Sequence, residues 1–117
     1  MIANSKILSL LYNNLEKKVY NTSIVFAIIF TLYQLIPWEE TRKLILAMDD
    51  LIKLVLKCLK SDNSKIIFVS LNFLEIVQLY DPKWAESIKR KKFKINNRVS
   101  HNNYLIFYFK KGIFEIY

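Results

Sequence analysis

The chain has 117 residues, enough for one small domain or a few short repeats, and 53% of them are hydrophobic, which is ample for a core. The whole sequence contains one Gly and two Pro, which argues against an all-β sandwich or barrel because such folds need many tight turns. A formal net charge of +8 permits a nucleic acid, an acidic lipid surface or an acidic protein as partner, and it is equally consistent with a solvated lysine-rich surface.

The first part of the sequence predicts two helices. Residues 5–19 carry apolar side chains at three- and four-residue spacing, the pattern of an amphipathic helix. Residues 21–23 then offer capping side chains for a helix over about 23–36 that is apolar on nearly every side. Its apolar stretch is shorter than the roughly 20 residues that cross a bilayer, so we expect a buried helix and no transmembrane segment.

Two shorter helices are expected next, after Pro37 has ended the buried one. Residues 38–48 predict a short helix with acidic residues near its positive N-terminal end. Asp49 or Asp50 is expected to cap a further helix over about 51–60. That helix has the clearest amphipathic pattern in the chain, with one polar stripe formed by Lys53, Lys57 and Lys60.

A second buried helix is expected over about 65–80, after a turn and cap in residues 61–64. Asp81 is placed to end this helix and to cap another, with Pro82 at the first helical position, where its missing N–H has no cost. Trp84, Ala85 and Ile88 are expected to form one face of this last, short helix.

The order of these helices indicates a repeat. The segments "TLYQLI" (31–36) and "EIVQLY" (75–80) lie 44 residues apart, and each ends a buried helix shortly before a Pro and a Trp. Armadillo and HEAT repeats have a period of about 40–47 residues, and their apolar helices must be covered by neighbouring repeats. We therefore predict an all-α fold of armadillo- or HEAT-like stacked helices, an α-solenoid fragment, with an ordinary helical bundle as the alternative.

The sequence changes character near its C-terminal end. Residues 94–103 are polar and are expected to be irregular, and residues 104–117 are aromatic and β-prone, like a short hairpin. We accordingly divide the chain into about two helical repeats over residues 1–94 and a polar linker with an aromatic tail over 95–117.

No catalytic, cofactor or metal site is expected. His101 and Cys58 are the only histidine and the only cysteine, too few for a zinc site, which needs three or four such ligands. Cys58 lies in an apolar helical run and is interpreted as a small buried side chain. A chain without a second cysteine suits a reducing compartment.

A dense run of positive charge is the best candidate for a functional surface. We call it the basic segment, and it comprises Lys83, Lys89, Arg90, Lys91, Lys92 and Lys94. It is a candidate docking surface for an acidic partner. RNA or an acidic membrane surface is the alternative partner, and a solvated helix end is the alternative without function.

Two stretches carry a family resemblance: "IIFTLYQLIPWEETRKLIL" and, more specifically, "LNFLEIVQLYDPKWAESIKRKKFKINN". They resemble the C-terminal armadillo region of kinesin-associated protein, the non-motor accessory subunit of heterotrimeric kinesin-II. The most specific positions of the resemblance are Tyr80, Asp81, Trp84, Ala85, Ile88 and Phe93. The resemblance spans about residues 24–97.

The resemblance implies a non-enzymatic scaffold that uses no cofactor or small-molecule substrate. Its implied partners are the tails of the kinesin-II motor subunits and cargo adaptors. Its implied place is the cytoplasm, at the cytoskeleton and the cilium, in microtubule-based transport.

Overall fold

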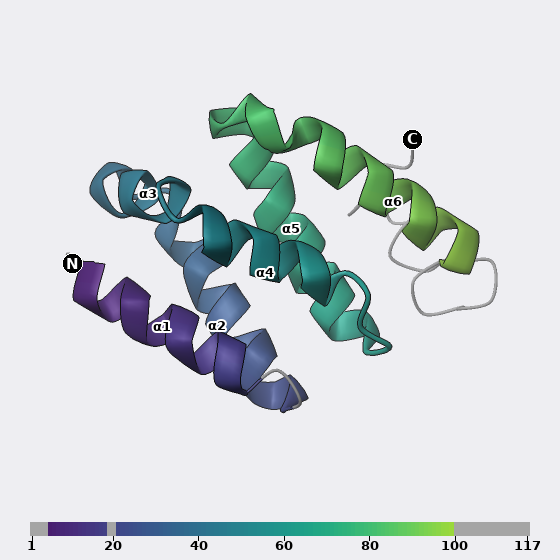
Figure 1. The fold of residues 1–117 in the computed structure, drawn as a ribbon, viewed down its shortest axis with the longest axis horizontal. Helices are drawn as coiled ribbons and strands as arrows, with labels where there is room; N and C mark the ends of the chain where they lie inside the picture. The colour runs from purple at the N-terminus through teal and green to yellow at the C-terminus, as the bar shows by residue number, and fades with distance from the viewer. Residues whose placement is uncertain (1–4, 19–20, 100–117) are drawn as a thin grey trace.

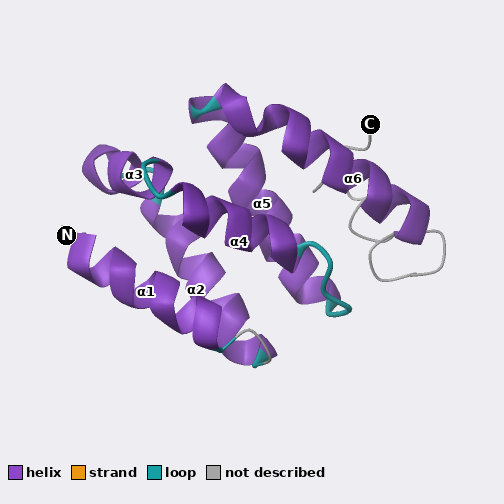
Figure 2. Ribbon diagram, in the orientation of Figure 1, coloured by secondary structure: helices purple, strands orange, loops and turns teal. Residues whose placement is uncertain are grey.

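A computed structural model describes residues 5–18 and 21–99, and these form α-helices and one 3₁₀-helix with no strand among them (Figures 1 and 2). The elements are α1 (Ser5–Lys17), α2 (Thr22–Leu35), α3 (Glu39–Leu46), α4 (Asp49–Cys58), α5 (Ser64–Tyr80), η1 (Pro82–Trp84) and α6 (Ala85–Val99). The expected helices are all present, with boundaries shifted by at most two residues. The last is the exception, because it is much longer than expected.

The helices stack in two layers. Figure 1 shows α1, α4 and α6 running in a similar direction in one layer, with α2 and α5 behind them. The most extensive contact in the molecule joins α2 to α5, while α1 packs on α2 and both α4 and α6 pack on α5. The fold is therefore all-α and armadillo-like, as the helix order predicts.

The core lies where the two layers meet. Its largest fully buried side chain is Phe73 of α5, and the buried residues of α2 and α5 belong to one continuous apolar cluster. Neither helix is covered all round, since Phe30 of α2 is 42% exposed and Leu79 of α5 is 72% exposed. Neighbouring helices nevertheless cover each of these two apolar helices on more than one side, as their composition requires.

Two asparagines begin the two buried helices. Asn21 Oδ1 accepts a hydrogen bond from the backbone N–H of Ile24 at 3.1 Å. Asn63 Oδ1 accepts from the backbone N–H groups of Lys65 at 2.9 Å and Ile66 at 3.3 Å. Both satisfy N–H groups that have no partner within the helix, so the predicted caps at residues 21–23 and 61–64 are confirmed.

The predicted cap of α4 is wrong. Met48 occupies the N-cap position without a side-chain hydrogen bond, and Asp49 and Asp50 already lie in the first helical turn. Their carboxylates there still favour the helix, because the N-terminal end of the helix dipole is positive. Asp81, similarly, ends α5 and precedes η1 without a side-chain cap, whereas Pro82 takes the first position of η1 as expected.

The helix α6 corrects the prediction for residues 94–99. These residues were expected to be irregular, but α6 continues through them to Val99. Ile88 and Ile95 are buried seven residues apart, so packing on α5 holds two turns that local composition alone leaves open. Ala85 is exposed, so it does not share the buried face of Trp84 and Ile88. The aromatic segment 104–117 and His101 lie outside the described residues, and their organisation stays a prediction.

Candidate protein-docking surface

The six residues of the basic segment do not form one surface. Lys83 lies in η1, and the other five follow one another along α6. Lys89, Arg90 and Lys94 are exposed, Lys91 is partly buried, and Lys92 is only 4% exposed. The segment therefore divides into a residue that joins two elements, a residue that faces the core, and four residues that remain for a partner.

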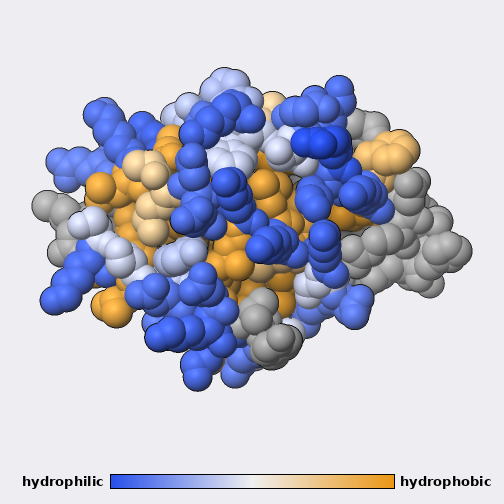
Figure 3. Space-filling model, viewed as in Figure 1, coloured by the Kyte–Doolittle hydropathy of each residue, from blue (hydrophilic) through white to orange (hydrophobic). Residues whose placement is uncertain are grey.

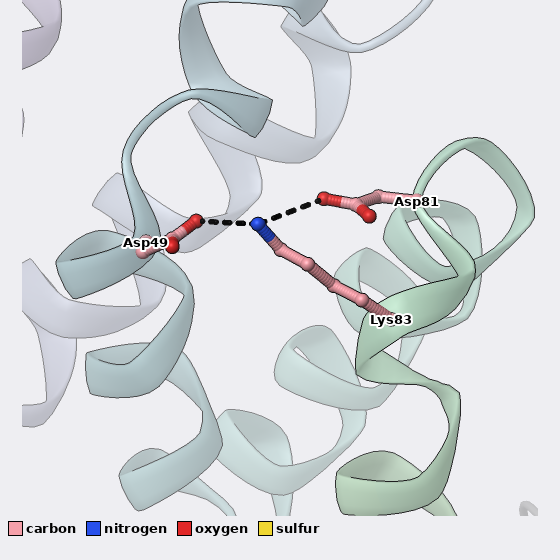
Figure 4. A network of polar contacts seen from close by, with 3 residues as sticks. All are labelled: Asp49, Asp81 and Lys83. Atoms are coloured by element: carbon pink, nitrogen blue, oxygen red, sulfur yellow. Dashed lines mark hydrogen bonds and ion pairs between the residues drawn. The ribbon is translucent and has the colours of Figure 1, made fainter.

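Lys83 is the residue that joins two elements. Its ammonium Nζ lies 3.1 Å from Asp49 Oδ1 in α4 and 3.7 Å from Asp81 Oδ2 at the end of α5 (Figure 4). The hydrogen bond to Asp49 is the main reason why the pKa of Lys83 is raised, with both carboxylates adding attraction. Nζ also lies 5.5 Å from the ring centroid of Trp84. We therefore assign Lys83 to holding η1 against the start of α4.

Lys92 is the residue that faces the core. Its ammonium forms an ion pair with the carboxylate of Glu75 on α5. The other oxygen of that carboxylate, Oε2, accepts a hydrogen bond from Gln78 Nε2 at 2.9 Å. The prediction that Lys92 contributes to an exposed docking surface does not agree with this position. The available sequence signal was its spacing from Ile88 and Ile95, four residues before and three after, on the apolar side of the helix.

The four remaining basic residues line a groove between α6 and α4. We call it the α4–α6 groove, and its volume is about 730 Å³. The lining residues are Leu56 of α4 and Glu86, Ser87, Lys89, Arg90, Lys91, Phe93 and Lys94 of α6. Leu56 is 7% exposed and Phe93 is 61% exposed, so the groove has an apolar wall on one helix and a protruding aromatic ring on the other.

A lysine just beyond the end of α4 adds its positive charge to those of α6 near this groove. Burial is the main reason why the pKa of Lys91 is lowered, and the positive charges of Lys60, Lys94 and Arg90 lower it further. Lys60 follows the end of α4 and belongs to the exposed lysine stripe predicted from the sequence. Figure 3 shows this face of the molecule largely covered by hydrophilic residues with hydrophobic ones visible between them. An anionic group in the groove would relieve the repulsion among these cations.

The described part of the chain offers little for chemistry. No three His, Cys, Asp or Glu side chains within it lie close enough together to hold a metal ion. Cys58 is buried, as predicted, and burial raises its pKa to about 11, so the thiol carries no charge near neutral pH. Within the same residues, no helix is both long enough and apolar enough to span a bilayer.

The comparison with known families decides what this scaffold is. The family model described as kinesin-associated protein (KAP) matches residues 1–105. The chain belongs to the kinesin-associated protein family. The resemblance predicted from the two sequence stretches is therefore confirmed. No solved structure matches the chain.

Kinesin-associated proteins are accessory, protein-binding subunits and not a known enzyme family. Most of the positions that carry the resemblance serve the fold of this member. Trp84 and Ile88 are buried in the core, and Tyr80 lies under the guanidinium of Arg42, 4.2 Å from its ring centroid. Phe93 differs. Its ring is exposed in the α4–α6 groove, so it contributes little to the apolar core.

Proposed function

We propose that the chain is a non-motor accessory module of kinesin-II that binds the tails of the motor subunits and links them to cargo adaptors. It acts in microtubule-based transport, in the cytoplasm and at the cilium. The observation that carries the proposal is the family match over residues 1–105. The stacked helices support it, since solenoids of this kind present extended surfaces to protein partners.

A binding experiment tests this function. The full chain is immobilised and incubated with peptides from kinesin-II motor tails and, in parallel, with scrambled peptides of the same composition. Retention of the tail peptides above the scrambled level supports the proposal. Equal retention of both would remove it, because sequence-independent capture is what a surface charge of +8 produces by itself.

A further inference from the structure

We propose that the α4–α6 groove binds an acidic amphipathic helix whose apolar side seats an aliphatic side chain between Leu56 and Phe93. The inference rests on the proposed protein-binding function and names the chemistry of one partner segment. It concerns a surface formed by the outer layer of helices, α4 and α6, and leaves the contact between α2 and α5 untouched.

The charge of the groove selects an acidic occupant. Its lining contains four cationic side chains against the single carboxylate of Glu86, and Lys60 adds a further positive charge beside Lys91. These positive charges repel one another at this range and so do not stabilise one another. A partner with several carboxylates therefore meets complementary positive potential along the edges of the groove. This potential speeds the encounter with the partner and fixes its orientation.

The apolar part of the groove selects an amphipathic occupant. Phe93 is 61% exposed although it projects from the middle of α6. Leu56 supplies a second apolar contact from the facing helix. An occupant with only charge would leave both uncovered, whereas a helix with an apolar side would bury them, in the manner of helix-in-groove recognition.

Nucleic acid fits this groove less well. Proteins that hold single strands place several aromatic rings along a basic track, and among the described residues of the lining Phe93 is the only aromatic one. The aromatic tail of the chain itself fits poorly by charge, because residues 104–117 carry Lys110 and Lys111 against Glu115.

The probe is a synthetic peptide of about 18 residues, roughly five helical turns, with Leu on one side and Glu on the other. Its binding to the full chain is measured by fluorescence anisotropy. A scrambled peptide, a single-stranded oligonucleotide and phosphatidylserine vesicles are measured in parallel. We expect the amphipathic peptide to bind, and the scrambled peptide to bind about tenfold more weakly. Equal binding of the two peptides, or binding of the oligonucleotide or vesicles in preference to both, overturns the proposal.

Two variants test the groove itself. Lys91→Glu with Lys94→Glu reverses the charge of the rim, and Phe93→Ser removes the apolar contact; each is expected to weaken the peptide about tenfold. The control is Lys6→Glu with Lys17→Glu, which makes the same charge change on the exposed lysines of α1 and is expected to leave binding nearly unchanged. Equal losses in both charge-reversed proteins, or full binding by Phe93→Ser, would show that net charge alone attracts the peptide.

A cross-link identifies the occupant. Photo-reactive benzoyl-phenylalanine in place of Phe93 in the full chain is expected to cross-link to the amphipathic peptide. A cross-link to residues 104–117 that excess peptide does not displace would assign the groove to the chain's own tail and overturn the proposal. The proposed function is tested separately. If motor-tail peptides bind all groove variants as well as they bind the unaltered chain, the proposed function stands and the groove is rejected as their binding site.

Discussion

Lys92 of α6 forms an ion pair with Glu75 of α5, and its side chain is 4% exposed, whereas Lys94 two residues later is exposed to solvent. A lysine is costly to bury unless its charge is paired, so this contact allows Lys92 to lie on the same buried side of α6 as Ile88 and Ile95. The same rotation of the helix places Lys91, Lys94 and Phe93 at the α4–α6 groove.

The ion pair between Lys92 and Glu75 should be visible in stability. We expect Lys92→Met alone to lower the free energy of unfolding by about 2 kcal/mol, because Glu75 then keeps an unpaired charge. This is below the value for a fully buried pair, since the Glu75 side chain is 24% exposed and retains some water. Adding Glu75→Leu to Lys92→Met should recover part of the loss. Urea denaturation followed by circular dichroism measures these two variants and Glu75→Leu alone. A loss in the double variant equal to the sum of the losses in the two single variants would show no coupling.

The two tryptophans should respond very differently to truncation. Trp84 is 7% exposed, and we expect Trp84→Ala to cost about 3–5 kcal/mol of unfolding free energy, because it leaves a large cavity between η1 and α5. Trp38 is 54% exposed and provides the matched control, with an expected loss below about 1 kcal/mol. Chemical denaturation of the two variants would contradict the assignment if their losses were similar.

Lys83 should matter for stability and not for partner binding. We expect Lys83→Met to lower the Tm at low salt and to do so less at high salt, because its ion pairs with Asp49 and Asp81 are exposed and screened. The raised pKa of Lys83 means that its contribution is fully present below the pKa of an unfolded lysine and is lost as pH rises through the folded value. The Tm difference from the unaltered chain should therefore vanish at strongly alkaline pH.

The control for Lys83 is Lys89→Met, another exposed lysine. It lines the α4–α6 groove, so it is expected to weaken the acidic peptide and to leave the Tm nearly unchanged. Calorimetry and anisotropy on the two variants give opposite patterns if the assignments are correct. An unchanged Tm together with weakened peptide binding in Lys83→Met would show that this lysine belongs to the docking surface.

Cys58 should be unreactive until the protein opens. Its pKa is raised to about 11 by burial, so thiolate is scarce at pH 8 and a thiol reagent has little access. We expect labelling by Ellman's reagent to be roughly a hundredfold slower in native buffer than in denaturant. Native labelling as fast as in denaturant would show that the packing around the end of α4 does not cover the thiol.

The same residue predicts an alkaline limit to stability. A raised folded pKa favours the neutral thiol, so the contribution is complete below the pKa of an unfolded cysteine, about 8.5, and is lost as pH rises through about 11. Cys58→Val has no thiol to titrate, so its free energy of unfolding should fall less between about pH 8.5 and about pH 11. An equal loss of unfolding free energy in the two proteins across that pH range, measured by denaturation, would contradict the expectation.

The helices were predictable where the determinants are local. Asn21 and Asn63 cap within three residues of themselves, and the apolar composition of α2 and α5 required cover whatever the neighbours were. The extent of α6 was not predictable in this way. Its last turns are polar in sequence, and what holds the helix there is the burial of Ile95 in the core and the ion pair of Lys92 with Glu75 of α5, contacts that local patterns do not specify.

The docking surface was predictable only in part. A cluster of basic residues pointed to the right helix, but the groove also needs Leu56 and Lys60, which are about thirty residues earlier in the chain and reach it only through the packing of α4. Likewise, the run of lysines by itself does not distinguish Lys92 from its neighbours; only its spacing from Ile88 and Ile95 does, and that spacing is informative only once α6 is known to continue past Lys94. The position of Asp49 beside Lys83 depends on the same tertiary arrangement.

The apolar contact between α2 and α5 has a mechanical consequence. It joins the α1–α2 pair to the remainder of the molecule mainly through aliphatic and aromatic packing, which has no directional preference. Separating these helices would therefore expose apolar surface to water and break few directional bonds, unlike separating the strands of a hydrogen-bonded sheet. Once opened by a pulling force, such a joint would re-form by burying the same apolar surface again.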